Sequence, residues 1–270
     1  MCRLLGQDIL LSQINNLTID SFPRTCLLQG EKGCGKHLLI ELISEKLRLE
    51  SIKLEDISVD IIADIQSKSE PFIYYIDADE LTEKDQNVLL KFIEEPLKNS
   101  YIILITENIY NLLPTIVNRC VIFNFCNYAR NDLFKFAEKY NMDKDDIIDI
   151  CNTPGKIIEY QYINFEELFS LCDKIADKIF IAPFYNTLTI ANKLNLNKDD
   201  NDKIDIRLFI DCLSLTIYKK YLENNNKKLL DLYKVAINYK NNFCKYKKLN
   251  QENLFLNFIT NIWMESRKDG

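Results

Sequence analysis

The residues best suited to chemistry lie in a short glycine-rich segment near the N-terminus. Residues 30–37 read GEKGCGKH, and Gly30, Gly33 and Gly35 are three of only six glycines in the 270-residue chain. Glycines let a backbone wrap closely around a phosphate, and the amides and helix N-terminus supply positive potential. Lys36 would reach the outer phosphates. The segment nearly completes the pattern GxxxxGK followed by Ser or Thr, which predicts a phosphate-binding P-loop.

The last position of this pattern is altered. His37, the only histidine, stands where a Ser or Thr hydroxyl would bind Mg²⁺. Imidazole is a poor ligand for this hard cation, which prefers oxygen. We therefore interpret His37 as a replaced metal ligand in a loop that has lost full function. We expect ATP or ADP to bind weakly, and Mg²⁺ to bind only together with a nucleotide.

A second candidate group is an acid at the end of an apolar run. Residues 73–77 read IYYID, so Asp77 has the place of a Walker B aspartate, which holds the metal through water. Active ATPases of this type carry a glutamate next, but here Ala78 follows. Asp79 or Glu80 could compensate, although the favoured interpretation is that they cap the next helix. Two altered positions make hydrolysis by this chain alone doubtful.

Arg119 is one of seven arginines and lies just before a predicted strand. A planar, permanently charged guanidinium at a domain edge suits the γ-phosphate of a neighbouring subunit, as an arginine finger. From its local sequence alone, a surface salt bridge is the favoured alternative.

The elements that must position these residues alternate along the first 125 positions. Continuous apolar runs predict buried strands, and amphipathic stretches between them predict helices. This order predicts a mainly parallel sheet covered by helices on both sides. The expected strands are 25–29, 71–76, 101–106 and 121–125, and the clearest helices are 38–49 and 83–93, the latter ending near Pro96.

From about residue 127 only helical patterns follow. Short amphipathic helices are expected at 131–140 and 143–151, and longer ones from 166 onward, with polar linkers at 195–202 and 224–226. We expect three domains: an α/β domain at 1–126, a small helical domain at 127–163 and a helical C-terminal domain at 164–270.

Composition limits the function classes. No apolar run is long enough to cross a bilayer, no signal-peptide pattern is present, and we expect a cytoplasmic protein without membrane contact. None of the nine cysteines forms a CxxC pair, so we expect no bound zinc and no metal site of the protein's own apart from Mg²⁺ held with a nucleotide. The net charge of −6 argues against a surface that grips nucleic acid all over. Nine lysines within 219–248 form either a solvated helical face, the favoured reading, or a patch for DNA or an acidic partner.

The order of these motifs resembles the AAA+ clamp-loader family and, within it, the delta-prime type of subunit in bacterial DNA polymerase III. The "NALLK.LEEP" and "SRC" motifs of that family are its most specific features, and here they correspond to residues 87–96 and 118–120. The matching segments are 5–7, 30–37, 58–65, 76–82, 87–96, 106–108, 118–120 and 153–156.

The resemblance implies an AAA+ P-loop domain, a helical lid at 127–163 and an all-α collar at 164–270. It implies that Thr106 lies at sensor 1 and that Arg119 is a trans arginine finger. Such a subunit would join gamma/tau-like and delta-like subunits through its collar. Within that assembly it would help to load a sliding clamp on primed DNA for the polymerase holoenzyme, without needing to hydrolyse ATP itself.

Departures from the family keep two other functions open. Asn118 replaces Ser, Gly155 stands at the sensor 2 arginine with Lys156 next to it, and the cysteine-rich zinc insert is missing between the P-loop and the Walker B strand. One alternative is an active gamma/tau-like ATPase motor. The other is a non-replicative interaction protein on a degenerate AAA+ fold.

Overall fold

The structure is a computed structural model, and it describes residues 4–68, 70–94, 100–181, 183, 206–241 and 251–268. The chain forms two compact units, one comprising residues 1–140 with 152–158, the other 141–151 with 159–270. Residues 127–163 are thus shared between the two units, and the expected division into three domains stays a prediction. The expected helix end at Pro96, the linker at 195–202 and the lysines of 242–248 lie outside the described residues.

A five-stranded parallel sheet forms the centre of the first unit. Its order is β2-β3-β4-β1-β5, and every described pairing is parallel, which confirms the predicted kind of sheet. Four of the five strands were predicted, and three of their eight ends differ from the predicted ends, by no more than two residues. The strand β2 was not predicted. The strands are β1 (Thr25–Gln29), β2 (Ser51–Lys53), β3 (Ile73–Asp77), β4 (Tyr101–Thr106) and β5 (Val121–Asn124).

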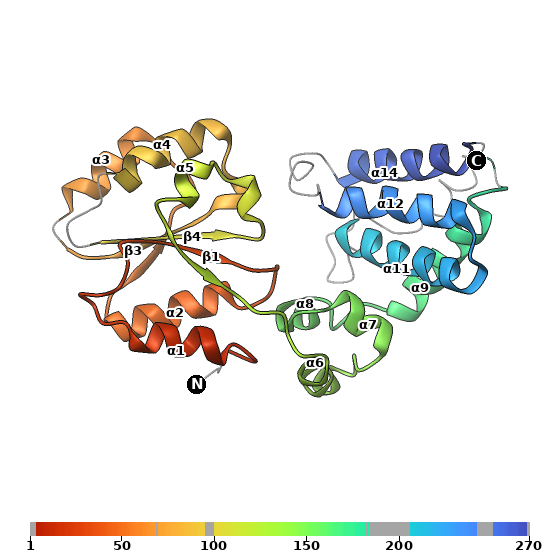
Figure 1. Cartoon of the computed structure of the whole chain (residues 1–270), viewed down its shortest axis with the longest axis horizontal. Helices are drawn as coiled ribbons and strands as arrows, with labels where there is room; N and C mark the ends of the chain where they lie inside the picture. Colours follow the sequence, from red (N-terminus) through yellow and green to blue (C-terminus); the bar gives the residue numbers. More distant parts are fainter. Residues whose placement is uncertain are drawn as a thin grey trace. The chain divides into compact units, whose positions relative to one another are not determined.

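Helices cover both faces of this sheet (Figure 1). One face carries α1 (Asp8–Asn16) and α2 (Lys36–Leu47). The opposite face carries α3 (Val59–Ser67), α4 (Glu83–Glu94) and the single turn α5 (Pro114–Val117). Two short 3₁₀ turns, η1 (Ala78–Glu80) and η2 (Ile109–Asn111), follow β3 and β4.

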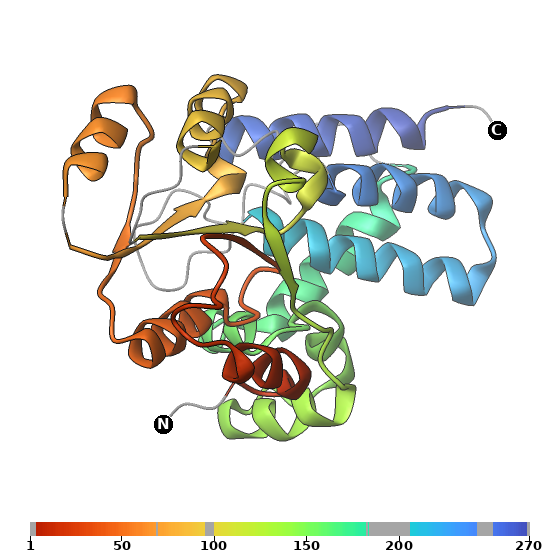
Figure 2. The same ribbon diagram turned by 60° about the vertical axis from the view of Figure 1, so that its left-hand side comes forward.

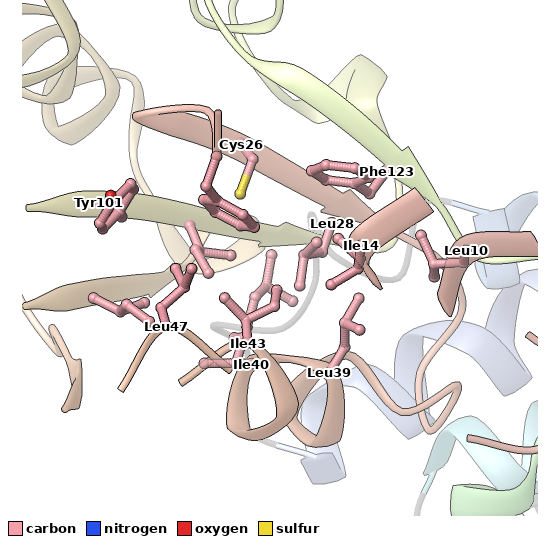
Figure 3. Packing of buried hydrophobic residues seen from close by; sticks show 14 of the residues in the cluster. Leu10, Ile14, Cys26, Leu28, Leu39, Ile40, Ile43, Leu47, Tyr101 and Phe123 are labelled. Atoms are coloured by element: carbon pink, nitrogen blue, oxygen red, sulfur yellow. The ribbon is translucent and has the colours of Figure 1, made fainter. Parts of the chain in front are cut away.

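The alternation of side chains along β1 builds both halves of the core. Cys26 and Leu28 point to the α1/α2 side, where Figure 3 shows them among Leu39, Ile40 and Ile43 of α2. Leu27 points to the other side, into the cluster formed with α3, α4 and α5. Because a central strand is buried on both faces, its sequence is a continuous apolar run rather than an alternating one. This strand leads directly into the glycine loop.

The remaining elements are helical. In the first unit β5 leads to α6 (Arg130–Ala137), the turn η3 (Glu138–Tyr140) and the start of α8 (Pro154–Glu159). The second unit contains α7 (Asp145–Ile150), α9 (Phe165–Lys178), α11 (Ile206–Asn224), α12 (Lys227–Asn241) and α14 (Gln251–Ser266).

Three long helices of the second unit, α11, α12 and α14, run side by side in both views (Figures 1 and 2). Phe209 of α11 fills the space between them, with its ring centroid 5.7 Å from that of Phe255 and 6.2 Å from that of Phe258. All three rings are buried. None of the helices in the described ranges combines the length and the apolar character that a bilayer crossing requires.

Candidate functional site

The glycine loop joins β1 to α2, in the position that the sequence predicts. Gly33 and Gly35 have φ of 79° and 96°, a left-handed conformation that side chains with a Cβ rarely adopt. Gly35 is also the residue that caps α2, which starts at Lys36. The loop therefore has the backbone shape of a P-loop, and its glycines are needed for that shape.

The Lys36 ammonium is bound by the loop itself. Its side chain is buried, and Nζ donates hydrogen bonds to the carbonyl oxygens of Gly30 and, at 2.9 Å, of Glu31. A P-loop lysine that holds phosphates extends outward instead. In this structure the loop's own carbonyls accept from the ammonium that would reach the outer phosphates.

The start of α8 closes the tip of the loop. The Gly155 N–H donates to the Gly33 carbonyl at 2.9 Å, and Thr153 Oγ1 donates to the Lys32 carbonyl at 2.8 Å. A Cβ on Gly155 would lie 2.4 Å from the Gly33 Cα, so no larger residue fits there without movement of the backbone. The structure therefore explains why position 155, where the resemblance placed an arginine, is a glycine.

A charged pair reinforces this closure. Lys156 is buried, and its Nζ donates to Asn152 Oδ1 at 2.8 Å and lies 3.6 Å from Glu31 Oε2. Asn152 Nδ2 in turn donates to the same Glu31 oxygen at 2.6 Å. Sequence reasoning did not assign a role to Glu31 or to Asn152. The one signal in the sequence that could have indicated this contact was Lys156, directly after the glycine at the sensor 2 position.

The acid after β3 and the predicted sensor residue are also engaged within the chain. Thr106 is fully buried at the end of β4, and its Oγ1 donates to Asp79 Oδ1 at 2.7 Å. Asp79 Oδ2 accepts a second bond from the Glu107 N–H at 2.6 Å. Asp77 Oδ1 accepts from the Asp79 N–H at 3.3 Å, so the residue that caps η1 is Asp77 and not Asp79 or Glu80, which the sequence favoured as caps of the next helix. Asp79 thus serves as a structural acceptor.

His37 lies at the exposed start of α2. Its ring centroid is 5.8 Å from that of Tyr75 on β3, and the two rings meet edge to face at 71°. Aromatic pairs prefer this arrangement. The contact gives His37 a packing partner, and its reading as a replaced metal ligand stays a prediction.

A cavity of about 230 Å³ opens beside the loop. Its wall includes Glu31, Cys34 and Tyr128, and the Tyr128 hydroxyl donates to the Cys34 carbonyl at 2.6 Å. Burial is the main cause that raises the pKa of Tyr128 to about 12. Gln7 fixes the adjoining backbone, because its side chain bonds both the N–H (2.9 Å) and the carbonyl (2.8 Å) of Cys126.

Arg119 lies directly after α5, and the partners of its guanidinium in the described part of the chain are not residues of the glycine loop. Its Nη2 is 2.7 Å from Glu94 Oε1 of α4, and its Nη1 donates to the Thr115 carbonyl at 2.9 Å. The side chain is still 41% exposed. The salt bridge that the local sequence favoured is present, and the finger role stays a prediction.

The structure therefore brings together the loop and residues 152–156. It also joins the loop to the sensor strand, since the Gly30 N–H donates to the Thr106 carbonyl at 3.1 Å. Arg119 belongs to a separate place on the same unit.

Solved structures show the fold to which the chain belongs. A DNA polymerase III gamma subunit-related protein of Thermotoga maritima superposes with a TM-score of 0.52 over 97% of this chain and 99% of its own, at 14% identity. A RuvB mutant of the same organism gives 0.51 over 94% and 88%, at 15% identity. The fold is that of an AAA+ P-loop protein with a helical C-terminal region, as predicted.

Sequence comparisons show which proteins parts of the chain resemble. Residues 50–129 match the family described as "DNA polymerase III, delta subunit". The DNA polymerase III subunit delta' of Haemophilus influenzae is 34% identical over 112 residues (37% of this chain, 34% of the relative), and that of Bacillus subtilis is 30% identical over 142 residues (39% and 43%). The subunit gamma of Buchnera aphidicola from Schizaphis graminum is 25% identical over 172 residues (50% and 47%).

Over these segments the chain is similar to delta' and gamma subunits of DNA polymerase III, in agreement with the resemblance drawn from the motifs. The matched regions span between about a third and a half of the length of these curated relatives.

Proposed function

We propose that this chain is a supporting subunit of a bacterial clamp loader, of the delta' kind, which donates Arg119 to a nucleotide held by a neighbouring subunit. One contrast carries the proposal. Lys36, the cation of its own P-loop, is buried and bonded to the loop's carbonyls, whereas Arg119 reaches the surface. The chain's own site is thus engaged from within, and its finger is available to a partner.

The contacts of the P-loop support weak nucleotide binding at most. A phosphate would have to draw Lys36 away from two carbonyl acceptors, and hydrogen bonds of a charged group contribute about 1.5–3 kcal/mol each. It would also meet the Glu31 carboxylate beside Lys156. Turnover lacks support as well, because Ala78 follows Asp77, and Asp79 is occupied by Thr106 and Glu107. No observation favours the motor alternative.

The proposed partners follow from the family. The C-terminal helices would join gamma/tau-like and delta-like subunits in the cytoplasm, and the assembly would act on a sliding clamp at primed DNA. Ion pairs of the described lysines of 219–248 support the reading of this segment as a solvated helical face. Four of them are in ion pairs with carboxylates of their own unit: Lys219 with Asp146, Lys220 with Asp177, Lys234 with Asp231 and Lys240 with Asp211.

The test is ATP turnover by the chain alone and after mixing with its cognate gamma/tau-like and delta-like subunits, clamp and primed DNA. We expect no turnover alone and strong turnover in the mixture. Arg119→Ala should lower the rate of the mixture by about 10³-fold, the typical effect of losing an arginine finger. Lys36→Ala should leave that rate unchanged.

Two outcomes would contradict the proposal. Turnover by the isolated chain that Lys36→Ala abolishes would make it a motor. A mixture whose rate does not respond to Arg119→Ala would remove the finger assignment.

A further inference from the structure

The guanidinium of Arg119 is held from two sides by groups of its own unit. Glu94 Oε1 lies 2.7 Å from Nη2, and the Thr115 carbonyl accepts from Nη1 at 2.9 Å. Within the described part of the chain, the Thr115 carbonyl is the one hydrogen-bond acceptor of the guanidinium and Glu94 its one ionic partner, so N–H groups remain for a further ligand. The side chain therefore combines a fixed direction with free donors, although it is half-exposed at the surface.

Both ends of this ion pair rest on rigid supports. Glu94 is the last described residue of α4, directly after Phe92 and Ile93, which are buried in the core. The backbone N–H of Arg119 bonds the carbonyl of Ile116, which is also buried, at 3.0 Å. The two side chains are therefore brought together by backbone that is anchored to buried residues of the same unit.

Stability alone is a weak reason for this pair. The Arg119 side chain is 41% exposed and that of Glu94 is 48% exposed. Ion pairs between such exposed groups contribute little to folding, because water screens the charges and ordering two long side chains costs entropy. An ordered side chain favours binding where a long arginine must meet a phosphate, because the conformational entropy of the side chain has been lost before the partner arrives.

We propose that Glu94 is a positioning residue for Arg119: it holds the guanidinium in the direction in which the free N–H groups meet the γ-phosphate of a nucleoside triphosphate on the neighbouring subunit. The inference rests on the proposed function, since it concerns the same arginine. Glu94 acts through Arg119 and does not touch the nucleotide.

The experiment compares variants of this chain in the complete assembly, with cognate subunits, clamp and primed DNA. Glu94→Ala should lower kcat for ATP by about tenfold and leave KM for ATP unchanged, because only the orientation of the finger is lost. Glu94→Gln should retain most of the rate, since its amide oxygen still lies beside Nη2. Glu83→Ala, at the exposed start of the same helix, is the matched control and should have no effect.

A double variant separates positioning from a general structural role. In the Arg119→Ala background, Glu94→Ala should have no further effect on kcat, because the residue through which it acts is gone. Thermal unfolding of each variant chain and its recovery in the purified assembly show that folding and assembly are intact. Should Glu94→Ala fail to assemble, Glu94→Gln together with Glu94→Asp gives the same comparison.

Each outcome bears on one of the two proposals. If the assembly with Arg119→Ala is inactive while the assembly with Glu94→Ala is as active as the original or more active, the role of Glu94 is overturned and the finger assignment stands. A further loss from Glu94→Ala in the Arg119→Ala background would also overturn it. An assembly that does not respond to Arg119→Ala would instead overturn the proposed function.

Discussion

The Thr106 hydroxyl donates a 2.7 Å hydrogen bond to Asp79, so two residues whose positions suggested nucleotide chemistry are bonded to each other. β3 and β4 are adjacent and parallel, which brings the end of β4 next to the turn that follows β3. In this chain the pair ties two neighbouring strand ends together.

Removing this acceptor should destabilise the protein. Asp79→Ala leaves the buried Thr106 hydroxyl and the Glu107 N–H without their acceptor, and we expect a loss of about 2–3 kcal/mol in the free energy of unfolding. Thr106→Val should cost less, and the double variant should cost less than the sum of the two. Denaturant unfolding measures all three. A change below about 0.5 kcal/mol for Asp79→Ala would contradict the structural role.

The contact between Gly155 and Gly33 gives a second prediction. Gly155→Ala would normally favour a helix by up to about 1 kcal/mol. Here the new Cβ would lie 2.4 Å from a backbone atom, so we expect a destabilisation of about 1–3 kcal/mol instead. Denaturant unfolding of the variant and of the original chain measures this change. Stabilisation by Gly155→Ala would mean that the loop and α8 separate readily.

Tyr128 predicts a dependence on alkaline pH. Its pKa rises from 10 in the unfolded chain to about 12 in the folded one, chiefly through burial. The folded state therefore holds the phenol proton more tightly, and this contribution is complete below pH 10 and is lost as the pH rises from 10 through about 12. Tyr128→Phe should lower stability by about 1 kcal/mol at pH 7, through loss of the bond to the Cys34 carbonyl.

The difference in the free energy of unfolding between Tyr128→Phe and the original chain should then narrow above pH 10 and change sign before pH 12, because a rise in pKa from 10 to about 12 costs the folded state more than about 1 kcal/mol once the phenol ionises. Urea unfolding at several pH values, together with tyrosinate absorbance, measures both effects. A constant difference across that range would show that Tyr128 ionises at its ordinary pH in the folded chain.

The ion pair between Lys240 and Asp211 links α12 to α11 at a distance of 2.8 Å, with the Asp211 side chain only 5% exposed. Lys240→Ala would leave this carboxylate buried without its cation. We expect a loss of about 2–3 kcal/mol, less than for a fully buried pair because Lys240 is half-exposed. Lys234→Ala, which breaks the exposed pair with Asp231, should change stability by no more than about 0.5 kcal/mol in the same unfolding assay. Equal losses of stability in Lys240→Ala and Lys234→Ala would contradict the expectation that burial of Asp211 makes its ion pair the more important one.

The parts of the fold that sequence patterns predicted are those in which local signals agree. The apolar run of β1, the glycines after it and the helix behind them all lie within 25 residues, and each has a distinct composition. In contrast, β2 contains only Ser51, Ile52 and Lys53, too short and too polar for an apolar run to mark it.

The site was harder to predict because its partners are far apart in the chain. Glu31 and Lys156 are separated by 125 positions, and no local pattern of charge links them. Glu94 and Arg119 belong to motifs that the sequence indicated one by one, but their ion pair depends on the packing of α4 against α5. Spacing can therefore indicate which residues matter, whereas pairing requires the fold.

The two bonds from Gln7 to Cys126 have a mechanical consequence. Cys126 lies just beyond β5, an edge strand of the sheet, at the point where the chain leaves the α/β elements. A pull on the chain from its C-terminal side would reach the Gln7 amide before it reached the pairing of β5 with β1. Since the Gln7 side chain bonds both backbone polar groups of Cys126, these two hydrogen bonds would bear such a force first and protect the edge strand from being pulled off the sheet.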